Sequence, residues 1–137
     1  MSGELEQILL DEGFSSEPYL DHLFNWTIGH GLTNITERES TAVVGMRLED
    51  LEEQIKGHLH WFPALPEEIR NVLLNMAYQL GVAGLMGFSK TLAYINKGKF
   101  VDASEEMLDS KWARQTPNRA KRLSDRLRAV SGDTMVL

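Results

Sequence analysis

Apolar residues recur along most of the chain at the i, i+3, i+4 spacing of an amphipathic helix. This repeat covers residues 3–12, 36–60, 66–80, 89–96, 100–108 and 117–130. The strongest run predicts a buried central helix and consists of Ile69, Val72, Leu73, Met76, Ala77 and Leu80. The pattern therefore predicts a mostly helical protein.

Residues typical of helix starts support several of these predicted boundaries. Thr36 and Glu39 form a capping box, in which a hydroxyl and a carboxylate satisfy free backbone N–H groups. We expect Ser89 to cap the helix that follows it. Thr116 is followed by Pro117, the order expected of an N-cap and a first helical residue.

Glycines suggest where helices end or are interrupted. Gly13 and Gly81 each follow a helical run, so we expect them to end it. We further expect a break near Gly45, and turns at Gly84 and Gly87.

Residues 18–35 lose the helical repeat and favour strands instead. We expect a turn near residues 22–25, and Gly29 and Gly31 permit a second tight turn. The strand-favouring side chains are Tyr19, Trp26, Thr27 and Ile28. The short strand region, with helices on either side, predicts a protein of the α+β class that is mostly helical and has one small β region.

Composition narrows the class of protein. The 137 residues suit one domain, and the absence of cysteine excludes disulfides and thiolate chemistry. No apolar run approaches the roughly 18 residues of a membrane span, and the first residues are acidic rather than basic. We therefore expect synthesis in the cytoplasm without a signal peptide and no membrane insertion.

Charge is unevenly distributed along the chain. Residues 1–88 contain 4 Lys and Arg against 14 Asp and Glu, a net charge of −10; residues 89–137 contain 10 against 6, a net charge of +4. Three interpretations fit this distribution. The two parts could be lobes that attract one another, the basic part could bind a polyanion, or both could be solvated helix faces.

Two carboxylates and a hydroxyl near the start of the chain are the strongest candidates for chemistry. Hydrolysis of a glycosidic bond needs one protonated and one ionised carboxyl group. Glu12 lies in the last turn of a predicted helix, where the helix dipole disfavours an anion and so favours the protonated acid. Asp21 is predicted at a strand–turn junction, and Thr27 could hold a water beside it. By spacing alone, two surface acids are the favoured interpretation, because two acids nine residues apart are common.

Three ordered blocks resemble the T4-type phage lysozymes. Glu12, Asp21 and Thr27, within DEG, YLD and TIG-x-G, resemble the catalytic stretch of that family. NMAYQLGVAGLMGF at 75–88 resembles its central helix, and SKWARQTPNRAKR at 110–122 resembles its C-terminal signature. The resemblance implies a single lysozyme-like domain over 1–137. Its small lobe would span about 13–60 and its helical lobe 1–12 with 61–137, with a cleft between them.

The resemblance also implies a function. It predicts an endolysin: an inverting muramidase that hydrolyses the β-1,4 bond between N-acetylmuramic acid and N-acetylglucosamine in bacterial peptidoglycan, for host-cell lysis. It implies a monomer without cofactor that acts on the wall after a holin-type partner has permeabilised the membrane. A lytic transglycosylase, and an inactive glycan-binding or virion structural protein, remain alternatives.

Residue roles follow by matching position. Glu12 would be the general acid, Asp21 the base or electrostatic partner and Thr27 the water-positioning hydroxyl. Arg119 would pair with Glu12. Gly29 and Gly31 would support the catalytic site, and the substrate-contacting positions would be Tyr78, Gln79, Thr91 and Glu106.

Three departures from the family pattern stand out. Glu106 replaces a family Asn, so its contact with substrate is in question. His30 is displaced by one position from the family's Gly-x-Gly-His, and the segment before Thr36 is shorter than in the best-known member.

Other groups of residues are weaker candidates for a functional site. His58 and His60 lie two apart, on different faces of a helix, and we expect no metal site there. Trp61 and Trp112 could stack sugars or be buried. Core-facing leucines interrupt the basic run over 119–128, so we expect a solvated helix face and no nucleic-acid binding.

Overall fold

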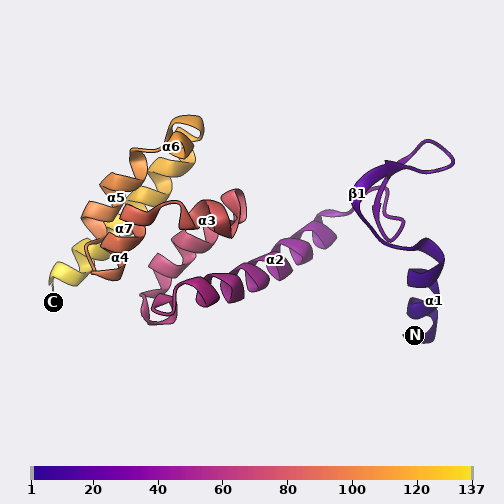
Figure 1. Cartoon of the computed structure of the whole chain (residues 1–137), viewed down its shortest axis with the longest axis horizontal. Helices are drawn as coiled ribbons and strands as arrows, with labels where there is room; N and C mark the ends of the chain where they lie inside the picture. Colours follow the sequence, from indigo (N-terminus) through magenta and orange to yellow (C-terminus); the bar gives the residue numbers. More distant parts are fainter. Residues whose placement is uncertain (1, 137) are drawn as a thin grey trace. The chain divides into compact units, whose positions relative to one another are not determined.

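The computed structural model describes residues 2–136, and side chains within residues 3–130. The chain divides into two compact units, Met1–Val44 and Gly45–Leu137, with the boundary inside helix α2. The first unit contains the β region and the second contains most of the helices (Figure 1). The predicted α+β, mostly helical class is confirmed. The predicted lobe boundaries, and a cleft between the lobes, stay predictions.

The first unit consists of a short helix followed by a two-stranded sheet. Helix α1 spans Ser2–Glu12 and ends as predicted at Gly13, whose φ is 66° and whose N–H donates to the Leu9 carbonyl at 3.0 Å. Strands β1 (Ser15–Leu20) and β2 (Trp26–Gly29) pair antiparallel. β1 therefore starts earlier than the predicted residue 18.

The sheet register changes along the hairpin. Tyr19 pairs with Thr27, while Ser15 pairs with Gly29, so the ladder is irregular between Ser15 and Tyr19. Pro18 lies in this interval and has no N–H to donate, which suits an irregular edge strand.

Helix α2 spans Glu37–His58 and starts at the predicted capping box. The Thr36 N–H donates to the Glu39 carboxylate at 2.8 Å, and the Glu39 N–H donates to the Thr36 hydroxyl at 3.1 Å. The backbone and hydroxyl hydrogen bonds with Thr36 hold the pKa of Glu39 below its usual value. The predicted break at Gly45 is wrong, since α2 runs through it. One exposed glycine costs a helix only about 0.5–1 kcal/mol, and no proline adds to that cost.

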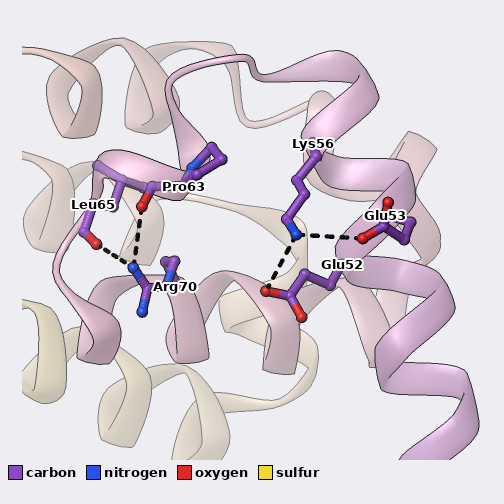
Figure 2. Close-up of polar contacts among 6 residues, drawn as sticks. All are labelled: Glu52, Glu53, Lys56, Pro63, Leu65 and Arg70. Carbon is purple, nitrogen blue, oxygen red and sulfur yellow. Dashed lines mark hydrogen bonds and ion pairs between the residues drawn. The ribbon is translucent and has the colours of Figure 1, made fainter.

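A short connector joins α2 to the central helix α3. The 3₁₀ turn Phe62–Ala64 buries Phe62. The Arg70 guanidinium donates to the carbonyls of Pro63 and Leu65 at 3.2 and 2.8 Å, and so fastens the connector to α3 (Figure 2). On α2, Lys56 lies 3.3 Å from the Glu53 carboxylate.

Helix α3 spans Glu67–Met86 with a kink at Gly81, where φ is 77° and ψ is 163°. The predicted stop at Gly81 therefore appears as a change of helix direction. The turn predicted at Gly84 is wrong, because Gly84 lies in the resumed helix, where an added Cβ would be 2.8 Å from that of Leu80. Five residues of the predicted apolar stripe are buried in the core, and the sixth, Leu80, is partly buried and packs against it: Ile69, Val72, Leu73, Met76 and Ala77 are the buried five.

Four further helices complete the second unit: α4 (Ser89–Asn96), α5 (Phe100–Leu108), α6 (Lys111–Gln115) and α7 (Pro117–Val136). α5 and α7 pack side by side (Figure 1). α7 buries Ala120, Leu123 and Leu127. Along residues 2–136 no single helix is long and apolar enough to cross a membrane, although the bent pair α3 and α4 passes the same test together.

Local details at three helix starts differ from the predictions. Ser89 is the first residue of α4 rather than its cap, and Phe88 holds the cap position without a side-chain hydrogen bond. Thr116 directly precedes Pro117, the first residue of α7, as predicted, and its carbonyl accepts from the Ala120 N–H at 3.0 Å; its hydroxyl, however, donates to the Trp112 carbonyl of α6 at 2.9 Å. The sequence pattern missed α6, which starts with the Ser110 hydroxyl accepting from the Ala113 N–H.

Candidate active site

The loop between β1 and β2 holds Asp21 in a fixed orientation. The backbone N–H groups of Leu23 and Asn25 both donate to Asp21 Oδ1 at 2.8 Å, and the Asp21 N–H donates to the Asn25 carbonyl at 2.9 Å. Hydrogen bonds from Asn25 and Leu23, with the nearby His22, hold the pKa of Asp21 below its usual value, against partial desolvation. Asp21 is therefore an ionised carboxylate at neutral pH.

Glu12, the last residue of α1, lies against the second tight turn. Ile28 and Leu32 exchange two backbone hydrogen bonds of 2.9 and 3.0 Å across this turn, in which Gly29 and Gly31 adopt φ of 67° and 73°. An added Cβ on Gly31 would overlap Oε2 of Glu12 and lie 2.8 Å from its carboxyl carbon. The close approach of Glu12 to the turn thus requires glycine at position 31.

Gly31→Ala is expected to displace the Glu12 carboxyl group. The new methyl occupies the space of that carboxyl group, and alanine is also disfavoured at a φ of 73°. We expect any Glu12-dependent activity to fall by about 10²-fold, as for an acid misplaced by about 1 Å. Release of soluble fragments from purified bacterial cell walls would measure it.

Gly29→Ala is the matched control for this prediction. It carries the same backbone strain, but its Cβ would meet only Leu32 at 3.6 Å. Equal losses of activity in the two variants would contradict a specific role for the space beside Glu12.

Thr27 is buried, with 4% of its surface exposed, and its hydroxyl donates to the Asn25 carbonyl at 2.9 Å. Since its proton is used in that bond, Oγ1 can accept a hydrogen bond from a water but not donate that proton to it. Asn25 thus connects Thr27 to the loop that holds Asp21.

His30, displaced from the family position, has an interaction of its own. Its ring packs against Phe14 with centroids 5.2 Å apart. It therefore helps to attach the glycine turn to the segment between α1 and β1.

Arg119, on α7, is held by a residue of the central helix. Its Nε and Nη2 donate to Asn75 Oδ1 at 3.0 and 2.7 Å, and Nη2 also donates to the Asn75 carbonyl at 3.2 Å. Sequence analysis did not assign a role to Asn75. The pairing of Arg119 with Glu12 stays a prediction.

Two predicted substrate-contacting residues lie on α3. Tyr78 is 40% exposed. The Gln79 Oε1 accepts a hydrogen bond of 2.8 Å from the indole N–H of Trp112, a buried residue whose ring meets Phe88 edge to face at 5.7 Å. This bond fixes the amide orientation of Gln79, so its NH₂ group remains as a donor.

Trp112→Phe is expected to lower the free energy of unfolding by about 1–3 kcal/mol. Phenylalanine leaves Gln79 Oε1 without its donor and fills less of the core. Urea denaturation would measure the change. A Trp61→Phe variant, which changes a half-buried tryptophan outside this bond, serves as control. Equal effects of the two changes would argue against a special contribution of the Gln79 bond.

Thr91 and Glu106 line a cavity of about 520 Å³ in the second unit, together with Trp112. Thr91 is buried with 2% of its surface exposed, so Glu106 is the more accessible of the two. Lys90 and Lys111 also line the cavity, which gives it charges of both signs.

The basic run on α7 is largely engaged by acidic residues. Arg126 lies 2.6 Å from the Glu68 carboxylate, and Arg128 lies 3.5 Å from that of Glu105. These ion pairs support the interpretation as a solvated helix face. In the part of the chain that the structure describes, no group of three or more His, Cys, Asp or Glu could hold a metal ion.

Comparison with known proteins places the chain in a family. The family model for phage lysozyme matches residues 10–129. A probable T4-type lysozyme of Dictyostelium discoideum is 31% identical over 65% of this chain and 54% of its own length. The pre-baseplate central spike protein Gp5 of Enterobacteria phage T4 is 33% identical over 66% and 16%, and the SAR-endolysin of Enterobacteria phage P21 is 30% identical over 70% and 61%.

The helical α+β fold and the match over most of the sequence show that this chain belongs to the phage lysozyme family. The resemblance of the sequence motifs to the T4-type phage lysozymes is confirmed. The chain spans less than two thirds of the length of each of these three relatives.

Proposed function

We propose that this protein is a peptidoglycan hydrolase of the muramidase type. It would cleave the β-1,4 bond between N-acetylmuramic acid and N-acetylglucosamine with inversion at the anomeric carbon. Family membership and the relatives named lysozyme and endolysin support this class of activity. The observation that carries the proposal is an oriented, ionised Asp21 carboxylate in the same compact unit as Glu12.

The proposed mechanism gives the two carboxyl groups different tasks. Glu12, in its protonated form, gives a proton to the leaving oxygen. Asp21, kept ionised by its hydrogen bonds, takes a proton from the attacking water. The Thr27 oxygen accepts a hydrogen bond from that water, because its own proton is held by the Asn25 carbonyl. Tyr78, Gln79, Thr91 and Glu106 are the proposed contacts to the substrate.

Mass spectrometry of fragments released from purified peptidoglycan tests this function. We expect reducing N-acetylmuramic ends. Anhydro-muramic ends would replace the hydrolase by a lytic transglycosylase. Folded protein that binds the wall and releases nothing would contradict both enzymes.

The similarity to Gp5 favours one alternative from another class. That relative is named as a spike protein of a virion, so a structural role is a second candidate for this chain. The chain retains Glu12, Asp21 and Thr27, which a purely structural protein would not need. The same wall-degradation assay separates the two roles.

We also propose that lysis of the host depends on a holin-type partner that permeabilises the inner membrane. Expression of the protein alone in bacteria should then leave the culture turbid, and a membrane-permeabilising agent should trigger clearing within minutes. Optical density, with Glu12→Gln as the inactive control, measures this. Spontaneous clearing by the active protein alone would contradict the dependence.

A further inference from the structure

A second cavity, of about 270 Å³, lies between α2 and α3 within the second unit. One face of α2 contributes Arg47, Asp50 and Gln54, which are three and four residues apart and therefore neighbours on the helix. From α3, Tyr78 and the kink residue Gly81 complete the lining. An added Cβ on Gly81 would meet nothing within 4 Å, so the kink leaves open space there.

Three polar side chains of this cavity have no partners among the residues that the structure describes. Within residues 3–130, Arg47, Asp50 and Gln54 make no side-chain hydrogen bond or ion pair. Elsewhere on the same helix Lys56 pairs with Glu52 and Glu53, so α2 does form ion pairs between its turns (Figure 2). Arg47 and Asp50 therefore present a free cation and a free anion to a ligand.

The walls of the cavity are fixed by the core. Ile55 and Ala77 are 0% and 1% exposed, and Arg70 fastens the connector between the two helices (Figure 2). Leu51 and the ring of Tyr78 add apolar surface beside the charges. Ligand sites typically combine an apolar lining with a few oriented polar groups in this way.

We infer that this cavity binds the free end of a diamino dicarboxylic acid in the peptide stems of peptidoglycan. Such an end carries an ammonium and a carboxylate on one carbon, at the tip of an aliphatic chain. The ammonium pairs with Asp50, the carboxylate with Arg47, and the aliphatic chain packs on Leu51 and Tyr78. A neutral sugar would leave both charges without an ionic partner. The inference rests on peptidoglycan being the substrate proposed above.

Titration of the ¹⁵N-labelled full chain with two probes tests this inference. The probes are the tripeptide alanyl-γ-glutamyl-diaminopimelate and an N-acetylglucosamine oligomer. We expect the tripeptide to shift the amide resonances of residues 47–54 and 77–81. Asp50→Asn and Arg47→Gln should each weaken its binding about tenfold or more, as expected on loss of a charge-assisted hydrogen bond.

Glu49→Gln and Arg38→Gln make the same charge changes on α2 outside the cavity, and they should leave tripeptide binding unchanged. Shifts at this cavity with the sugar alone, no shifts with either probe, or equal binding by Asp50→Asn would each overturn the inference. Wall degradation is measured on the same samples. Degradation without tripeptide binding rejects only this site, whereas absence of degradation rejects the proposed function.

Discussion

Glu12→Gln is expected to reduce fragment release from purified peptidoglycan by about 10²–10⁴-fold, the usual contribution of a general acid. Glutamine keeps the size of the side chain beside Gly31 but has no acidic proton to give to the leaving oxygen. The variant should therefore fold and unfold as the parent does. Rates of release with saturating substrate, and circular dichroism during urea denaturation, measure the two properties.

Glu6→Gln is the matched control for this prediction. It makes the same chemical change six residues earlier on α1, at an exposed position. Full activity in Glu12→Gln would exclude Glu12 as the proton donor. A comparable loss in Glu6→Gln would point to a general effect of charge on α1.

Asp21→Asn is expected to lower activity by about 10²–10⁴-fold with little change in stability. The amide oxygen of asparagine can still accept from the N–H groups of Leu23 and Asn25, but it cannot take a proton from water. Asp21→Ala removes these hydrogen bonds as well, so it should lose activity and also destabilise the hairpin. Nearly full activity in Asp21→Asn would show that the carboxylate is not required.

Asp21→Asn and Asp21→Ala should differ from the parent in how the free energy of unfolding changes with acid. The pKa of Asp21 is lower in the folded protein than its ordinary value of 3.8. Its contribution to stability is thus fully present above that ordinary value and is lost as the pH falls through the lowered pKa. Urea denaturation from neutral pH to below this lowered pKa should show a larger loss of stability in the parent than in Asp21→Asn, which still contains Glu39 with its own lowered pKa.

Within each compact unit, neighbouring residues position the candidate site residues. Gly31 sets the space for Glu12, Asn25 connects Asp21 with Thr27, and Trp112 orients Gln79.

The sequence by itself determined the helices other than α6, most of their boundaries and the closeness in sequence of the catalytic candidates. These features depend on residues within about four positions of one another, as in the capping box of Thr36 and Glu39 or the stop at Gly13. Glu12, Asp21 and Thr27 lie within one short stretch, so the sequence alone marked them as candidates for chemistry.

Only the tertiary structure decided the contacts between distant positions. Gln79 meets Trp112 across 33 residues and Asn75 meets Arg119 across 44, and no local periodicity signals such pairs. The cavity beside Tyr78 likewise needs α2 and α3 to pack before Arg47 and Asp50 line one site. The physical reason is that helical repeats arise from neighbouring turns, whereas these contacts form only when the core brings separate elements together.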